Sequence, residues 1–262
     1  KSYDPDDPLN PLASGLAEEY QKVSDIPLLL DLLKVGSIGL EDRGEGAIYG
    51  FARRLILDIV VHHSPQDVQI IALADTPQAQ DRWSWLKWAP HTRSIYQGES
   101  LRRLAFTPQA IDKNVEWLIN EFENRRKSEP GVRKRAAKTA IFVLLDDSGD
   151  IRRTEDIRQL TELGREADIY LMFVGGRNWP RECRAKINVT KDEFKYTETF
   201  AGEDGGKRLR GQVDPASQLD CERIARSLAG WEISGGGGSS ALPETVRLSE
   251  LVDNKEITLE GL

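Results

Sequence analysis

The feature that most constrains this chain is the alternation, from about residue 26 onward, of short apolar runs with longer amphipathic stretches. This alternation is typical of strands that cross over through helices into a mainly parallel sheet. The runs that we expect to form strands are IPLLLDLL, VGSIGL, VQIIALA, RSIYQ, TAIFVLLDD and DIYLMFVGG. The sequence therefore predicts an α/β fold whose sheet is flanked by helices.

Helical spacing of apolar residues predicts helices over 47–62, near 77–88, over 107–127 and over 154–166. Thr107 and Pro108 supply a cap and a first-turn proline for the third of these. After the last central strand, the segments AKINVT, FKYTETF and LRGQV alternate as antiparallel strands do, and Asp214-Pro215 is predicted to start a final helix. We expect a small antiparallel extension near the C-terminus.

The composition of the chain changes at three places. We expect residues 1–22 to be a lead-in segment, 23–233 to form one domain, 234–240 (SGGGGSS) to be a flexible linker, and 241–262 to be a tail. The sequence leaves open whether the linker is natural or introduced. There is no starting methionine and no signal peptide, so we expect an excised piece of a longer protein.

Charge and cysteine content exclude several classes of partner. With 43 acidic and 36 basic residues the net charge is −7, so we expect no nucleic-acid partner. The local basic run RKSEPGVRKRAAK is interpreted as a solvated loop. Cys183 and Cys221 lie in no ligand motif, so no metal site is expected. No run approaches the ~20 apolar residues of a membrane span.

The loop DRGEGAIY lies between a predicted strand and a predicted helix, where a phosphate-binding loop would carry GxxxxGK[ST]. Aligning the following helix places Asp42 at the first glycine, Ala47 at the second, Ile48 at the lysine and Tyr49 at the Ser/Thr. All four positions differ from the motif. Without the lysine, and with carboxylates added, the loop is predicted to repel phosphate, and Ile48 is expected to join the core.

Two features of a nucleotide site remain in part. Gly44 and Gly46 form a GxG that could belong to a dinucleotide fingerprint, for which Asp75 is a weak ribose-binding candidate. The strand AIFVLLDD ends in Asp146 and Asp147, in the form of a Walker B motif. These acids could hold magnesium or polarise water, or they could only cap the turn that follows the strand.

Several of these segments, in this order, resemble one family. VGSIGL, the altered loop, ARRLILDIVVHHSPQDVQIIALA, RWSWLKWAPHT, FVLLDD, ADIYLMFVGGR, PRECRAKINVT and DCERIARSLAGW are similar to the FtsK/SpoIIIE-type ATPases of type VII secretion, the EccC/EssC proteins. The likeness covers about residues 23–250. It is strongest for the non-standard ATPase-like modules, especially the one between the membrane segments and the first full ATPase domain. Where active members carry Gln-Arg after the last central strand, this chain has Gly176-Arg177.

The resemblance implies a P-loop NTPase-like fold of the RecA/FtsK type, at the cytoplasmic face of a bacterial cell membrane. It implies neighbouring ATPase modules, membrane components of the secretion complex and Esx substrates as partners, with membrane contact only through other parts of the parent protein. We expect a non-catalytic module without a cofactor that acts in assembly or regulation. The alternative is an ATPase that binds ATP and magnesium through an atypical loop, with Arg177 as a sensor or finger.

The remaining conspicuous side chains are expected to be structural. Trp83, Trp85 and Trp88 are interpreted as core or sheet-edge packing, with a partner-binding surface as the alternative. His91 is expected to fix a turn. The pair His62-His63 is expected to end a helix, because adjacent positions do not share a helix face and are poorly placed to bind one metal.

Overall fold

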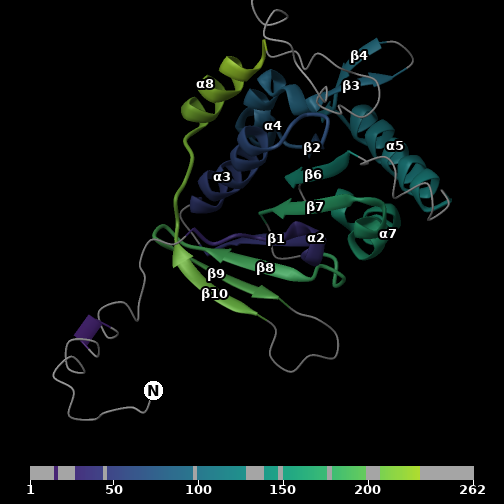
Figure 1. The fold of residues 1–262 in the computed structure, drawn as a ribbon. Coiled ribbons are helices and arrows are strands. Elements are labelled where there is room, and N and C mark those ends of the chain that lie inside the picture. Colours follow the sequence, from purple (N-terminus) through teal and green to yellow (C-terminus); the bar gives the residue numbers. More distant parts are fainter. Residues whose placement is uncertain are drawn as a thin grey trace, which may run out of the picture.

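The computed structural model describes residues 15–16, 27–43, 46–96, 99–127, 139–146, 150–175, 179–198 and 207–230. Its centre is an eight-stranded sheet (Figure 1). The strands are β1 (Ser37–Asp42), β2 (Val68–Ala74), β5 (Leu104–Ala105), β6 (Ala140–Asp146), β7 (Ile169–Val174), β8 (Ala185–Val189), β9 (Glu193–Glu198) and β10 (Arg208–Gln212).

The strand order is β10-β9-β8-β1-β7-β6-β2-β5. All pairs from β8 to β5 are parallel, and β8, β9 and β10 pair antiparallel. The expected mainly parallel sheet with a C-terminal antiparallel extension is confirmed. Because β7 lies between β1 and β6, the loop after β1 and the end of β6 face each other across one strand, at the carboxyl edge where such sheets bind ligands.

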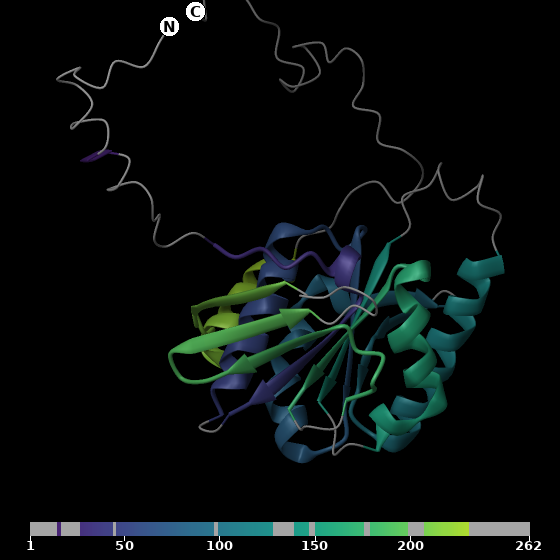
Figure 2. The same cartoon turned by 90° about the horizontal axis from the view of Figure 1, so that it is seen from below.

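Helices cover both faces of the sheet, as Figures 1 and 2 show. One face is covered by α3 (Ala47–His62), α4 (Pro77–Trp83), the 3-10 helix η1 (Ser84–Trp88) and α8 (Gln218–Leu228). The other face is covered by α5 (Pro108–Lys127) and α7 (Glu155–Leu163). A short helix, α2 (Leu32–Val35), precedes β1. The four predicted helices are confirmed, and the hydroxyl of Thr107 caps α5 as expected, by accepting a hydrogen bond from the backbone N–H of Ala110 at 3.3 Å.

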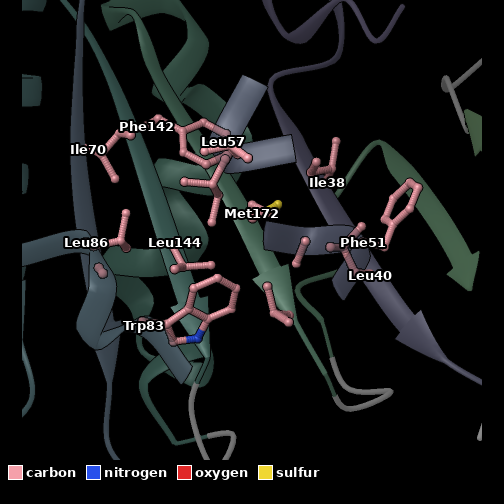
Figure 3. Packing of buried hydrophobic residues seen from close by; sticks show 14 of the residues in the cluster. Ile38, Leu40, Phe51, Leu57, Ile70, Trp83, Leu86, Phe142, Leu144 and Met172 are labelled. Carbon is pink, nitrogen blue, oxygen red and sulfur yellow. The ribbon is translucent and has the colours of Figure 1, made fainter. Parts of the chain in front are cut away.

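The core on the α3 side is built from alternate residues of five parallel strands and the buried stripe of α3 (Figure 3). Trp83 and Trp85 are 0% and 1% exposed and belong to this core. Trp88 packs against it from the edge, under the guanidinium of Arg226 at 4.0 Å from its ring centre. The packing interpretation of the tryptophans is therefore confirmed.

His91 ties two loops together. Its Nε2 lies 2.8 Å from the carbonyl oxygen of His63, which is the C-terminal cap of α3, and its ring is 2% exposed. Because a carbonyl only accepts, Nε2 carries the proton of the neutral ring. Burial lowers the pKa of His91 below its ordinary value. This bond joins two loops 28 residues apart, and the role of His91 in fixing its own turn stays a prediction.

Three details of the predicted elements were wrong. IPLLLDLL is not a strand, because the Asp31 carboxylate accepts a hydrogen bond from the N–H of Lys34 and starts α2 there. The segment RSIYQ does not join the main sheet: β3 (Arg93–Tyr96) pairs with β4 (Glu99–Arg102) in a separate hairpin. The last helix begins at Gln218, capped by Ser217, rather than at Asp214-Pro215.

The boundary prediction for the linker and tail, 234–262, and most of the basic run at 126–138 lie outside the described residues. The lead-in over 1–22 lies outside them except for residues 15–16. Within the described part of the chain, no helix has the length and apolar character needed to cross a membrane.

Candidate functional site

The two described ends of the loop between β1 and α3 are bonded to each other. The Asp42 carboxylate accepts a hydrogen bond from the backbone N–H of Gly46 at 3.1 Å, and Gly46 begins α3 with a φ of 70°. Only glycine adopts this left-handed conformation at little cost. A backbone N–H that could have faced an anion is thus directed at a carboxylate. Gly44, the other glycine of the predicted motif, lies outside the described residues.

The position that aligns with the phosphate-binding lysine belongs to the core. Ile48 is 0% exposed and packs in the cluster between α3 and the sheet. Ala47 is half-buried at the first helical position. The side chain of Ile48 therefore contacts other apolar groups of the core, as the helical spacing predicted.

Tyr49, at the position of the magnesium-binding Ser/Thr, reaches across the carboxyl edge of the sheet. Its hydroxyl oxygen lies 3.7 Å from the place where a Cβ of Gly175 would stand, at the end of β7. Gly175 has a φ of 76°, which also favours glycine there. Burial raises the pKa of the Tyr49 hydroxyl, against the opposing effect of Arg82. The Tyr49 side chain thus lies at the end of β7, the strand between β1 and β6.

The acid at the end of β6 is buried and engaged. Asp146 is 5% exposed. One of its oxygens, Oδ2, accepts hydrogen bonds from Arg82 Nε at 3.0 Å and from Trp83 Nε1 at 2.7 Å, and Arg82 Nη2 lies 3.0 Å from the same atom. Asp146 shares the side of β6 that carries Phe142 and Leu144, the two side chains labelled in Figure 3. Its bonds with Arg82 and Trp83 place its carboxylate against α4.

Arg82 joins the two halves of the site. Its guanidinium carbon lies 3.9 Å from the centre of the Tyr49 ring while its nitrogens contact Asp146. A guanidinium stacked on an aromatic face and bonded to a carboxylate is stabilised on both sides. We call Tyr49, Arg82, Trp83 and Asp146 the crevice cluster. Its members come from α3, α4 and β6.

The helix that carries Arg82 is fixed at several points. Thr76 caps α4 through the N–H of Ala79, Gln80 Nε2 donates to the carbonyl of Phe106 at 2.5 Å, and Gln218 of α8 donates to the carbonyl of Asp81. These contacts tie α4 to the strand-end loops on one side and to α8 on the other. The crevice cluster is therefore part of the rigid frame of the domain.

The segment before α8 also holds α3 in place. A Cβ at Gly50 would come within 2.8 Å of Cβ of Pro215, and the carbonyl of Gly50 accepts a hydrogen bond from the N–H of Ala216 at 3.0 Å. This close approach explains why glycine stands in the first turn of α3.

The structure thus brings the following predicted residues to one edge of the sheet: Asp42, Gly46, Ala47, Ile48, Tyr49 and Asp146. Asp147 and Arg177 lie outside the described residues. The sequence interpretation missed Arg82, which precedes Asp146 by 64 residues and stands in no motif with it. Within the described ranges, no three His, Cys, Asp or Glu residues are grouped to hold a metal ion.

Comparison with known proteins identifies the relatives of this fold. The chain is 33% identical over 236 residues to the ESX secretion system protein EccC of Thermomonospora curvata, which covers 88% of this chain and 17% of that protein. It is 26% identical over 234 residues to the ESX-1 secretion system protein EccCa1 of Mycobacterium tuberculosis, covering 88% of this chain and 27% of that protein. This chain belongs to the EccC/EssC family of type VII secretion proteins.

The solved structure of EssC ATPases 2 and 3 from Geobacillus thermodenitrificans matches 75% of this chain and 43% of its own, with a TM-score of 0.55 at 15% identity. At that identity the match supports the fold, which is that of a P-loop NTPase. No family model matches the chain. The chain spans 17% of the length of the Thermomonospora curvata relative and 27% of that of the Mycobacterium tuberculosis relative.

Proposed function

We propose that this EccC/EssC module is a non-catalytic, ATPase-like domain that acts in the assembly or regulation of a type VII secretion complex. The observation that carries the proposal is the crevice cluster, in which Asp146 is held by Arg82 and Trp83 while Tyr49 lies over Arg82. In a P-loop enzyme the acid at this strand end and a Ser or Thr hydroxyl of the loop hold the magnesium ion, and a lysine contacts the phosphates.

The residues of the crevice do not fit a magnesium–nucleotide. The Arg82 guanidinium already occupies Asp146 Oδ2, for which a divalent cation would have to compete, and Tyr49 stands at the position that aligns with the ion-binding Ser or Thr. Ile48 is buried, and Gly46 directs its N–H at Asp42. Binding would require breaking a buried ion pair, which costs about 3–5 kcal/mol before any phosphate contact forms.

In this role the domain acts by docking to other proteins through its surfaces. By kinship with EccC and EssC, its partners would be neighbouring ATPase modules of the same polypeptide, membrane components of the secretion complex and, through them, Esx substrates, at the cytoplasmic face of the bacterial membrane. A rigid frame suits this role, because a docking module transmits position only if its own elements hold together.

Titration calorimetry with ATP and magnesium tests the proposal. We expect no heat of binding at nucleotide concentrations up to about 1 mM. Any Kd would then be weaker than about 1 mM, which corresponds to less than about 4 kcal/mol of binding free energy. The matched variants are Asp146→Asn, inside the crevice cluster, and Asp58→Asn, on the exposed side of α3. Micromolar binding that disappears with Asp146→Asn and persists with Asp58→Asn would overturn the proposal in favour of the ATP-binding alternative.

A further inference from the structure

The outer face of the antiparallel extension carries an unusual arrangement of charge. In the β8–β9 register Lys186 opposes Thr197 and Asn188 opposes Lys195, and in the β9–β10 register Arg208 opposes Thr197 and Arg210 opposes Lys195. Residues directly opposite in a sheet share a face, as do residues two apart in a strand. The four cations Lys186, Lys195, Arg208 and Arg210 therefore share one face, which we call the basic sheet face.

This face is the one turned away from α3. The residues of opposite parity, Ile187, Tyr196 and Leu209, belong to the core on the α3 side or pack against it. In Figure 2, β8, β9 and β10 lie in front of α3 and α8, and no helix is drawn in front of these strands. The cover provided by α5 and α7 ends before β8, where the ring of Trp179 packs over Gly39 of β1.

In the part of the chain that the structure describes, no acid forms an ion pair with a cation of the basic sheet face, although exposed Glu193 lies on the same face two residues from Lys195. Lys186, Lys195, Arg208 and Arg210 are all exposed, and among the described residues none of them forms an ion pair. Lys195 and Arg210 stand directly opposite each other, and like charges in that position destabilise a sheet. The chain has 43 acidic residues and a net charge of −7, so a shortage of acids does not explain this.

The same surface is hollowed. A shallow hollow of about 480 Å³ is lined by Lys195, Thr197, Arg208 and Arg210 and by the strand segments at Tyr196 and Leu209. Arginine guanidinium groups match carboxylates in a bidentate geometry, and lysine adds a mobile point charge. Three cations around one hollow therefore favour a ligand that presents several carboxylates close together.

We propose that the basic sheet face is a docking site for an acidic protein segment, rich in Asp or Glu, from another part of the secretion complex. Charge complementarity supports this choice, and so does the length of the relatives, of which this chain covers only 17% and 27%. Most of such a polypeptide lies outside this module. The inference rests on the proposed assembly role for its choice of partner, but the face lies on strands that contribute nothing to the crevice cluster.

The test uses the full 262-residue chain. Fluorescence anisotropy measures the binding of a fluorescein-labelled decaglutamate peptide, and a labelled decaglutamine peptide is the neutral probe. Both are titrated at about 50 mM and 200 mM salt, because salt weakens binding that depends on charge pairing. We expect saturable binding of decaglutamate only. It should weaken at least tenfold in the double variant Lys195→Glu/Arg210→Glu and remain within about threefold in Lys195→Arg/Arg210→Lys, because the charges are kept.

The double variant Lys113→Glu/Arg223→Glu is the matched control. It changes the net charge by the same amount at exposed positions on α5 and α8. An equal loss of binding in this control, or no binding of decaglutamate to the original chain, would overturn the docking site. So would self-association in sedimentation that Lys195→Glu/Arg210→Glu abolishes, or tighter binding to phosphatidylserine vesicles or duplex DNA than to the peptide. Nucleotide calorimetry on the same samples tests the proposed function separately.

Discussion

The crevice cluster and the basic sheet face arrange their charges in opposite ways. In the crevice cluster, Arg82 and Asp146 carry opposite charges, and Arg82 Nη2 lies 3.0 Å from Asp146 Oδ2. Both side chains are largely buried, at 21% and 7% exposed. On the basic sheet face, Lys195 and Arg210 are of like sign, stand opposite each other and are exposed. The first arrangement is satisfied within the domain. The second is not satisfied by any ion pair among the described residues.

The comparison shows where a ligand is to be sought. A ligand at the crevice would have to displace contacts that the domain already makes, whereas an anionic ligand at the basic sheet face would relieve a repulsion. The edge at which P-loop folds usually bind their ligand is therefore the less available of the two. Three substitutions test this difference, from the largest expected effect to the smallest.

Arg82→Ala is expected to lower the free energy of unfolding by about 3–5 kcal/mol, because it leaves the buried Asp146 carboxylate with a neutral donor in place of its ion-pair partner. Urea unfolding followed by circular dichroism measures the change. The control is Arg54→Ala, which removes two exposed ion pairs, with Asp58 and with Asp214, and should cost about 1 kcal/mol or less. If the two variants lose the same free energy of unfolding, the crevice cluster does not stabilise the domain more than exposed ion pairs do.

Tyr49→Leu is expected to cost about 1–2 kcal/mol, because it removes the aromatic face on which the Arg82 guanidinium stacks. Tyr49→Phe keeps the ring and should cost clearly less in the same urea unfolding experiment. If both variants lose the same stability, the hydroxyl at the end of β7 matters rather than the stack, and the description of the cluster has to change.

Lys195→Gln is expected to raise the free energy of unfolding by about 0.2–1 kcal/mol, since it removes a like charge opposite Arg210. Thermal unfolding at low salt detects the rise, and added salt should diminish the gain. Lys113→Gln removes an exposed charge from α5 and should leave the stability nearly unchanged. A loss of stability in Lys195→Gln would mean that the basic sheet face is already compensated.

Much of the fold could be predicted from the sequence, because apolar spacing reports directly which side of an element is buried. The helix over 47–62 was predicted with its bounds, and so was the burial of Ile48 within it. Short apolar runs were less informative. IPLLLDLL has the composition of a strand, yet a cap at Asp31 starts a helix there, and the two-residue strand β5 is too short to leave a pattern.

The candidate site was predicted in part. Asp42, Tyr49 and Asp146 were singled out because the phosphate-loop and strand-end motifs have fixed spacings within their own segments. Arg82 was not, because its partner lies 64 residues away and no local spacing relates the two. The hollow at Lys195, Arg208 and Arg210 was missed for the same reason, since it depends on a strand register rather than on a motif.

The sequence by itself determined the layers of this protein and the departure of the loop over 42–49 from GxxxxGK[ST], because both depend on local residue identity and periodicity. The tertiary structure alone decided how the charges are arranged. It set a guanidinium from α4 against the acid of β6 and gathered cations from three strands on one face that no described helix covers. The physical reason is that charges interact through space at distances of a few ångströms, whatever their separation along the chain.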